Sequence, residues 1–271
     1  MTLVSVAQMN SQDDIELNFV VIEQLMQKSQ ASGASLIVFP ENFVCFAGGK
    51  QRQTAEQFEV IQARLEQLAH RYGLWIVAGT LPCPYRPDGS IIQDGRVRTV
   101  SLCISPEKTE ARYDKIHLFD VQVGDAVGGY KESKYFEPGT DVVVAKTPFG
   151  NIGLMVCYDL RFPELALTLR QQGAHLLTAP AAFTYTTGQM HWQLLLQARA
   201  IENQCYVCAV NRVGTDPYCH YSGGTQLIDP YGKIVAECPM GEASGISGTL
   251  DKEMLEAFRQ KFPVLHDADK F

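Results

Sequence analysis

Three short, continuous apolar runs constrain the fold of this chain more than any other feature of its sequence. The runs at 35–39, 152–156 and 175–179 have the length of strands and little polar alternation, a pattern typical of strands that are covered on both faces. Segments 13–32 and 54–72 instead carry apolar residues at helical spacing. Because strands buried on both faces need other layers packed against them, we predict an α/β fold.

Hairpins interrupt the alternation of helices and strands. Further strands are predicted at 3–9, 74–81, 97–105, 109–113, 141–146, 205–211, 225–228, 233–238 and 245–250. Further helices are predicted from the turn after Cys157 to about 172, at 188–203 and near the C-terminus, while 118–139 is predicted to be a long irregular loop. This mixture favours mixed sheets with helices on their outer faces, and two such sheets packed together would form a layered sandwich.

Length and charge limit the classes of protein to which the chain can belong. Its 271 residues show no repeat, linker or break in composition, so we predict a single domain over 1–271. The formal net charge is -7, without a run rich in lysine and arginine, which argues against nucleic-acid or anionic-membrane partners. The N-terminus lacks a positive leader and no apolar run approaches membrane-spanning length, so we expect a cytoplasmic protein.

The cysteines indicate reduced thiols and no metal site. The eight cysteines are scattered through apolar, strand-like contexts, unlike the framework of a small secreted domain. Cys205 and Cys208 have C-x-x-C spacing, but in a strand their side chains project to opposite faces, and no second pair completes a zinc site.

Segment 151–169 combines features expected around a nucleophile. Its apolar run ends at Cys157, and Asp159, Arg161 and Pro163 follow in what we interpret as a turn that opens a helix. A helix N-terminus behind the cysteine would favour the thiolate over the thiol. A cysteine beside an apolar strand is also commonly a small buried hydrophobe, so this segment alone leaves both catalysis and packing open.

Three ionisable residues, Glu41, Lys115 and Cys157, follow predicted strands in that order. Taken singly, the glutamate suits a helix cap or a salt bridge, and the lysine suits a solvated surface. Together with their surroundings, VFPEN, YDKIHLFD and VCYDLRFPEL, they resemble the nitrilase superfamily of carbon-nitrogen hydrolases. The resemblance extends to ESKYFEPG around Glu132, TTGQMHW, ARAIENQCYV and KFPVL, and so covers almost the whole chain.

The resemblance implies a four-layer α-β-β-α sandwich with two mixed central sheets, and hydrolysis without a cofactor. It implies that Cys157 is the nucleophile and that Glu41 is the general base and acid. Lys115 and the backbone N–H of Tyr158 would hold the oxyanion of the tetrahedral intermediate. Glu132 would be the second glutamate of the family, which positions the lysine and assists attack of water on a thioester.

Within the superfamily, YDLRFPELAL and ARAIENQCYV resemble the amidases that repair deaminated glutathione and the related omega-amidases. Both cleave an amide of a 2-oxo acid, and the resemblance implies that Arg161 and Thr187 hold the 2-oxo-acid end. Without the resemblance, Arg161 suits an ion pair with Asp159 or Glu164 equally well. Segment 211–224 is closer to bacterial omega-amidases, which leaves the substrate open.

Other functional classes remain alternatives from the sequence alone. Four histidines allow a Cys-His hydrolase, although no papain-like or caspase-like signature surrounds Cys157; they are His117, His175, His191 and His220. A nitrilase, an N-carbamoyl hydrolase and a non-catalytic binding protein on the same fold are further alternatives. The family commonly pairs subunits, so the resemblance also implies a homodimer or a larger homo-oligomer.

Overall fold

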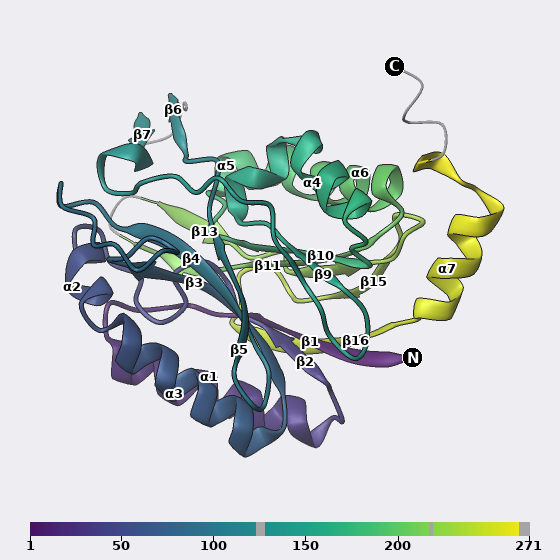
Figure 1. Ribbon diagram of the computed structural model, residues 1–271, viewed down its shortest axis with the longest axis horizontal. Helices are drawn as coiled ribbons and strands as arrows, with labels where there is room; N and C mark the ends of the chain where they lie inside the picture. The colour runs from purple at the N-terminus through teal and green to yellow at the C-terminus, as the bar shows by residue number, and fades with distance from the viewer. Residues whose placement is uncertain (123–127, 217–218, 266–271) are drawn as a thin grey trace.

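Two six-stranded sheets pack face to face between two layers of helices in the computed structural model of the chain (Figure 1). The structure describes residues 1–122, 128–216 and 219–265. Helices α1 (Ile15–Ala31) and α3 (Phe58–Tyr72) cover the outer face of one sheet. Helices α4 (Pro163–Gln171) and α6 (Gln193–Asn203) cover the outer face of the other. The predicted α-β-β-α sandwich is confirmed.

The first sheet has the strand order β16-β1-β2-β3-β4-β5. The central strands β1, β2 and β3 are parallel, whereas β16, β4 and β5 pair antiparallel with their neighbours. Its strands, in chain order, are β1 (Thr2–Gln8), β2 (Leu36–Val38), β3 (Trp75–Cys83), β4 (Arg98–Ile104), β5 (Thr109–Asp114) and β16 (Ser244–Leu250). The sheet is therefore mixed, and the last strand returns to pair with the first.

The second sheet has the strand order β15-β14-β11-β10-β9-β8. Here β9, β10 and β11 are parallel, and the remaining pairs are antiparallel. Its strands are β8 (Val144–Ala145), β9 (Ile152–Leu154), β10 (Leu176–Ala181), β11 (Tyr206–Asn211), β14 (Gln226–Ile228) and β15 (Ile234–Glu237). All three apolar runs that we predicted to be buried strands lie in the central parallel parts of the two sheets.

Strand β2 shows why a continuous apolar run is required at the centre of this fold. Leu36 and Val38 point between the two sheets, where they pack with residues of the second sheet. Ile37 points the other way, into the layer formed by α1 and α3. Both faces are buried, and each fully buried aliphatic side chain contributes roughly 1.5–3 kcal/mol to folding.

The predicted helix over 54–72 is wrong at its start, because the chain forms two helices. Helix α2 spans Gln51–Ala55 and α3 begins at Phe58. Ala55 packs with Val97 and Phe136 in a small separate cluster, whereas Phe58 packs into the core beneath α3. One continuous apolar pattern thus serves two clusters, and the chain must bend between them.

Short elements in the second half also differ from the prediction. The strand predicted at 141–146 is reduced to β8, and the predicted loop over 118–139 contains the pair β6 (Asp120–Gln122) and β7 (Gly129–Lys131) and the 3-10 turn Glu132–Lys134. A hairpin of β12 (Val213–Thr215) and β13 (His220–Ser222) was not predicted. These pairs have three residues a strand, too few for a periodic signal in the sequence.

The remaining helices follow the prediction closely. The predicted helix over 188–203 is a π-helical turn, Gly188–Trp192, continued by α6, and the short α5 (Tyr185–Thr187) precedes it. Helix α7 (Lys252–Lys261) is the helix predicted near the C-terminus, and residues 266–271 lie outside the described ranges. No described helix combines the length and the apolar character that a membrane span requires.

Candidate active site

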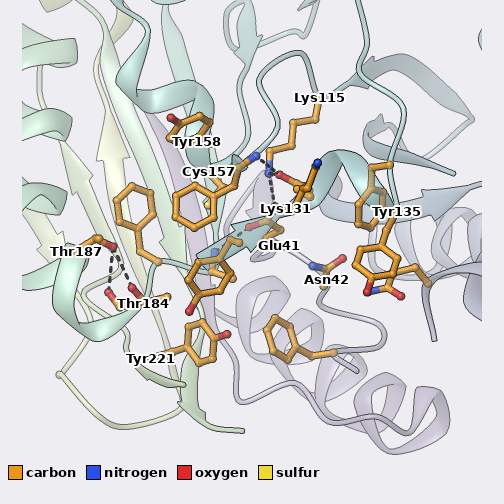
Figure 2. A pocket seen from close by; sticks show the side chains of 18 of the residues that line it. Glu41, Asn42, Lys115, Lys131, Tyr135, Cys157, Tyr158, Thr184, Thr187 and Tyr221 are labelled. Atoms are coloured by element: carbon orange, nitrogen blue, oxygen red, sulfur yellow. Dashed lines mark hydrogen bonds and ion pairs between the residues drawn. The ribbon is translucent and has the colours of Figure 1, made fainter. Parts of the chain in front are cut away.

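All seven residues that we associated with catalysis or substrate binding line one cavity of about 250 Å³. They are Glu41, Lys115, Glu132, Cys157, Tyr158, Arg161 and Thr187. They come from both halves of the sandwich, since β2 and β5 of the first sheet lead to Glu41 and Lys115 and β9 of the second leads to Cys157. Figure 2 shows Cys157, Glu41 and the end of the Lys115 side chain converging in this cavity.

Lys115 lies between two carboxylates. Its Nζ is 2.9 Å from Oε1 of Glu41 and 2.9 and 3.0 Å from the two carboxylate oxygens of Glu132. The lysine is 2% exposed. Burial by itself favours the neutral amine, but Glu132 and then Glu41 outweigh it and raise the pKa of Lys115 well above its usual range. The ammonium therefore stays charged inside the cavity.

Glu132 is held from its far side by the segment that follows β5. The backbone N–H of Phe119 donates to Oε2 of Glu132 at 2.6 Å, and the N–H of Glu132 donates back to the carbonyl of Phe119 at 3.3 Å. Burial raises the pKa of Glu132, and Lys115 opposes this effect. The reciprocal bonds fix the carboxylate against the lysine although Glu132 comes from an irregular part of the chain.

Both oxygens of Glu41 are engaged. Oε1 accepts from Lys115 and Oε2 accepts from the backbone N–H of Ala182 at 3.0 Å. The next residue, Asn42, has a left-handed backbone with φ of 54°, and its N–H donates to Oγ1 of Thr80 at 2.8 Å. This turn directs the carboxylate at the end of β2 toward the second sheet.

Cys157 occupies a strained turn directly after the second sheet's apolar run. Its φ of 48° lies in the left-handed region, which is costly for a residue with a side chain and is found where tertiary structure enforces it. Such a turn presents a nucleophile above the end of a sheet. Burial and the Glu41 carboxylate raise the pKa of the Cys157 thiol well above its usual range, while Lys115 and the N–H of Ala182 oppose them.

The predicted bias toward a thiolate is therefore wrong. A 3-10 turn, Cys157–Arg161, separates the cysteine from α4, which begins only at Pro163. The N-terminus of α4 is not directly behind the sulfur, and burial beside a carboxylate dominates. Glu41 is the carboxylate that contributes to the raised pKa of the thiol. The backbone N–H of Tyr158 lies near the start of the 3-10 turn. The first N–H groups of a helical turn have no acceptor within the turn, and this N–H is one of them.

Asp159 anchors this turn, a role that the sequence analysis missed. The residue is fully buried. Its Oδ2 accepts from the N–H of Val156 at 2.9 Å and from the hydroxyl of Tyr113 at 2.7 Å. Its Oδ1 accepts from the N–H of His117 at 3.1 Å and lies 2.7 Å from Nδ1 of the same residue. Asp159 thus ties the cysteine turn to the segment that carries Lys115.

Arg161 does not form the ion pair with Asp159 or Glu164 that the sequence allowed. Its guanidinium lies over the ring of Phe183, 5.4 Å from the centroid, and 3.4 Å from Nδ1 of His191. No carboxylate within the described ranges forms a salt bridge with it, although it lines the cavity beside Cys157. A cation in this position can receive an anionic group of a ligand.

Thr187 lines the same cavity as Arg161. Its Oγ1 is 3.1 Å from Oγ1 of Thr184, and both threonines are buried (Figure 2). One hydroxyl of the pair can donate outward while it accepts from its partner. The two threonines and Arg161 together offer polar donors for an oxygen-rich group.

The histidines do not provide an alternative base for Cys157. His117 is bonded to Asp159, His191 lies beside Arg161, and Nδ1 of His220 is 3.1 Å from Oγ1 of Thr215. His175 accepts from the N–H of Asn151 at 3.0 Å, at the far end of β9 from the cysteine. Within the part of the chain that the structure describes, no hydrogen bond joins any of the four to Cys157, which removes the geometric basis for a Cys-His hydrolase.

The C-x-x-C pair is divided between two cores. Cys205 packs beneath α4 and α6, whereas Cys208 packs between the sheets. Among the described residues, no group of three or more histidine, cysteine, aspartate or glutamate side chains is arranged to hold a metal ion.

Comparison with known proteins defines the class of this site. Residues 3–260 match the family model described as carbon-nitrogen hydrolase. The chain belongs to the carbon-nitrogen hydrolase family, the nitrilase superfamily, and is a hydrolase of that class.

Its relatives and structural neighbours agree with this assignment. A Yersinia enterocolitica protein named deaminated glutathione amidase is 40% identical over 266 residues, which cover 97% of this chain and 91% of that protein. The mouse protein of the same name is 36% identical, with 97% and 81% covered. The crystal structure of Caenorhabditis elegans NitFhit matches with a TM-score of 0.89 and 32% identity, over 98% of this chain and 64% of that longer chain. Saccharomyces cerevisiae Nit3, described as a member of branch 10 of the nitrilase superfamily, matches with a TM-score of 0.83 and 28% identity, with 97% and 94% covered.

Proposed function

We propose that the protein is a cysteine-dependent amidase that hydrolyses the amide bond of a small carboxylated 2-oxo acid, such as deaminated glutathione. The observation that carries the proposal is the cavity in which Cys157, Glu41 and Lys115 meet beside an arginine that has no carboxylate partner in the described chain. The names of the relatives support the substrate. Omega-amidase activity on 2-oxo-dicarboxylate monoamides is the second candidate, because it requires the same acyl group.

In the acylation step, Sγ of Cys157 attacks the amide carbon while its proton passes to Glu41. The oxyanion of the tetrahedral intermediate is received by Nζ of Lys115 and the N–H of Tyr158. When the C–N bond breaks, Glu41 returns the proton to the leaving nitrogen, so that ammonia or an amine departs and a thioester remains. Glu41 suits both proton transfers because its carboxylate is close enough to the thiol to raise the pKa of Cys157.

In the deacylation step, a water molecule attacks the thioester carbon and gives a proton to Glu41. The C–S bond breaks, the proton returns to sulfur, and the carboxylic acid product leaves. Lys115 stabilises the second oxyanion as it did the first. Glu132 holds the lysine in place through two hydrogen bonds and keeps it charged.

Arg161 and Thr187 hold the acyl end of the substrate in this proposal. A guanidinium binds a carboxylate through two charge-assisted bonds in one plane, and the Thr184-Thr187 hydroxyl pair offers a donor to the 2-oxo group or the carboxylate. This arrangement selects amides that carry a carboxylate over neutral amides.

A panel of substrates tests the proposal. Fresh reduced protein is assayed for ammonia or amine release from 2-oxo-dicarboxylate monoamides, deaminated glutathione, neutral amides, nitriles and N-carbamoyl compounds. We expect turnover of the 2-oxo-acid amides, its loss in Cys157→Ala with the fold intact, and an acyl adduct on the Cys157 peptide when Glu41→Gln stalls the reaction. Turnover of nitriles or N-carbamoyl compounds alone would replace the proposal, and no turnover of any compound would favour a binding protein.

We further propose that residues 1–271 form one domain, that the protein is cytoplasmic and that it assembles as a homodimer or larger homo-oligomer without a cofactor. The contiguous core between the two sheets supports the single domain. Light scattering across the micromolar range tests the assembly, and a monomer mass throughout would contradict it.

A further inference from the structure

Asn211 is a fully buried polar residue at the end of β11. Its side-chain Oδ1 accepts from the backbone N–H of Phe183 at 2.9 Å, and its Nδ2 donates to the carbonyl of Gly223 at 2.7 Å. Its own N–H and carbonyl are bonded to the hydroxyl of Thr225 at 3.0 and 3.1 Å. A buried amide is costly unless its polar groups are bonded. Both ends of this side chain are bonded, which fixes its orientation.

The bond to Phe183 replaces the end of a sheet ladder. Strand β10 lies between β9 and β11, and Ala181 pairs with Asn211 in the parallel register of β10 and β11 (Figure 1). The N–H of Arg212 still donates to the carbonyl of Ala181 at 3.0 Å, whereas the carbonyl of Arg212 accepts from the N–H of Gly223 at 3.1 Å. The next N–H on this edge of the chain, that of Phe183, is bonded instead to the Asn211 side chain.

This bond also sets the direction of the preceding N–H. The N–H of Phe183 points toward β11, whereas the N–H of Ala182 points to Oε2 of Glu41, to which it donates at 3.0 Å. Opposite directions are expected of successive residues that continue a strand. The Ala182 N–H also opposes the rise in the pKa of the Cys157 thiol. One N–H thus acts on both the base and the nucleophile, and its direction depends on Asn211.

We propose that Asn211 is a positioning residue for the general base. It holds the chain after β10 so that the N–H of Ala182 keeps the Glu41 carboxylate in place beside the thiol. Asn211 lies outside the lining of the catalytic cavity, so it acts through this N–H and does not touch a substrate held there. The inference rests on the proposed amidase function for the role of Glu41, but the effect on the thiol can be measured without turnover.

Two substitutions separate the acceptor oxygen of the side chain from its donor end. Asn211→Leu has a similar shape and removes both. Asn211→Asp keeps an oxygen for the N–H of Phe183 and loses only the NH₂ group that faces Gly223. Asn203→Leu is the matched control, because Asn203 is also buried and its Nδ2 donates to the carbonyl of Arg199 at 3.0 Å. Asn203 ends α6 and lies outside the lining of the cavity.

The first measurement is the rate at which iodoacetamide labels the Cys157 peptide at a fixed pH near 8. Loss of the Ala182 N–H removes a cause that lowers the pKa of this thiol, while Lys115 still holds Glu41 nearby. Less thiolate is then present, so Asn211→Leu should be labelled about threefold or more slowly than the wild type. Asn211→Asp and Asn203→Leu should stay within about twofold of the wild type. Mere loosening of the fold has the opposite effect, because exposure lowers the pKa of a buried thiol.

The second measurement is turnover of a 2-oxo-dicarboxylate monoamide. Because Glu41 takes and returns the proton in the proposed reaction, Asn211→Leu should lower kcat roughly 10- to 100-fold while KM changes less than about threefold. Asn211→Asp should keep kcat within about fivefold of the wild type, and Asn203→Leu within about twofold. Urea unfolding should nevertheless show all three variants to be less stable than the wild type, because each loses a buried hydrogen bond.

The outcomes separate this inference from the proposed function. Unchanged labelling and kcat in Asn211→Leu, or an equal loss of kcat in Asn211→Asp, would overturn the positioning role. Faster labelling of Asn211→Leu would also overturn it, since the residue would then only keep the fold closed. No turnover by the wild type would overturn the amidase proposal, while slower labelling of Asn211→Leu would still support the hold of Asn211 on the Ala182 N–H. If Asn211→Leu fails to fold, Asn211→Ala removes the same oxygen with less crowding and replaces it in both measurements.

Discussion

Replacement of Asp159 by asparagine should weaken both the fold and the catalytic turn. Asparagine keeps one acceptor oxygen and replaces the other with an NH₂ group. In one orientation this group faces the N–H of Val156, and in the other it faces the N–H of His117. Either way, one buried backbone N–H loses its acceptor, and the remaining bonds lose the help of the negative charge.

The size of the effect follows from these contacts. A buried donor left without an acceptor costs about 1–3 kcal/mol, and a hydrogen bond to a charged group contributes more than a neutral one. We expect the free energy of unfolding to fall by about 2–4 kcal/mol in Asp159→Asn. Asp159 ties the cysteine turn to the segment that carries Lys115, so weakening its bonds should let the reacting groups shift slightly. We expect kcat to fall roughly 10- to 100-fold, the loss typical of a small misplacement of reacting groups.

Urea unfolding followed by circular dichroism measures the first effect, and steady-state kinetics measures the second. Asp88→Asn is the matched control: Asp88 is exposed and accepts from the N–H of Ser90 at 2.9 Å, a bond that asparagine preserves, so its change should stay within about 0.5 kcal/mol. An Asp159→Asn variant as stable as this control and with wild-type kcat would refute the anchoring role.

Three further predictions concern charge. Removing the carboxylate in Glu41→Gln should lower the pKa of the Cys157 thiol, because Glu41 is one of the causes that raise it. Iodoacetamide labelling of the Cys157 peptide should then reach its midpoint at a lower pH than in the wild type, and an unchanged or higher midpoint would contradict this. Burial lowers the pKa of His175 from 6.5 to about 4, so its contribution to stability is complete above pH 6.5 and is lost as the pH falls toward 4, by about 1–3 kcal/mol; an NMR titration midpoint near 6.5 would refute this. Arg161→Lys keeps the charge but loses the planar fork, so kcat/KM should fall about tenfold or more on a 2-oxo-dicarboxylate monoamide and much less on a neutral amide; equal losses would show that Arg161 only supports the turn.

The strand-end residues could be placed from the sequence because buried strands are recognisable and their ends are where side chains leave the sheet. Glu41 and Cys157 each follow an apolar run. Cys157 itself has a left-handed backbone, and so does Asn42, the residue after Glu41. Glu132 had no such signal. It lies beyond β7 in a segment without periodicity, and only the resemblance to the family selected it.

Asp159 and its partners could not be found in this way. The bonds of Asp159 to Tyr113 and His117 join residues 46 and 42 positions apart. Tyr113 lies in β5 and His117 just after it, whereas Asp159 lies in the 3-10 turn that follows β9 of the other sheet. In the sequence, the neighbouring Arg161 was an equally good partner.

Charge conservation links these features of the site. In the proposed reaction, one lysine cation lies between two glutamates, and the thiol stays protonated until the amide is attacked. Transfer of the thiol proton to Glu41 leaves the charge of the cluster unchanged, and attack on the amide then moves negative charge from sulfur to the oxyanion beside Lys115. Because the proton passes next to the leaving nitrogen, the site draws no proton from solvent during acylation. A raised thiol pKa is thus compatible with rapid attack, since the thiolate forms only as the substrate carbonyl receives its charge.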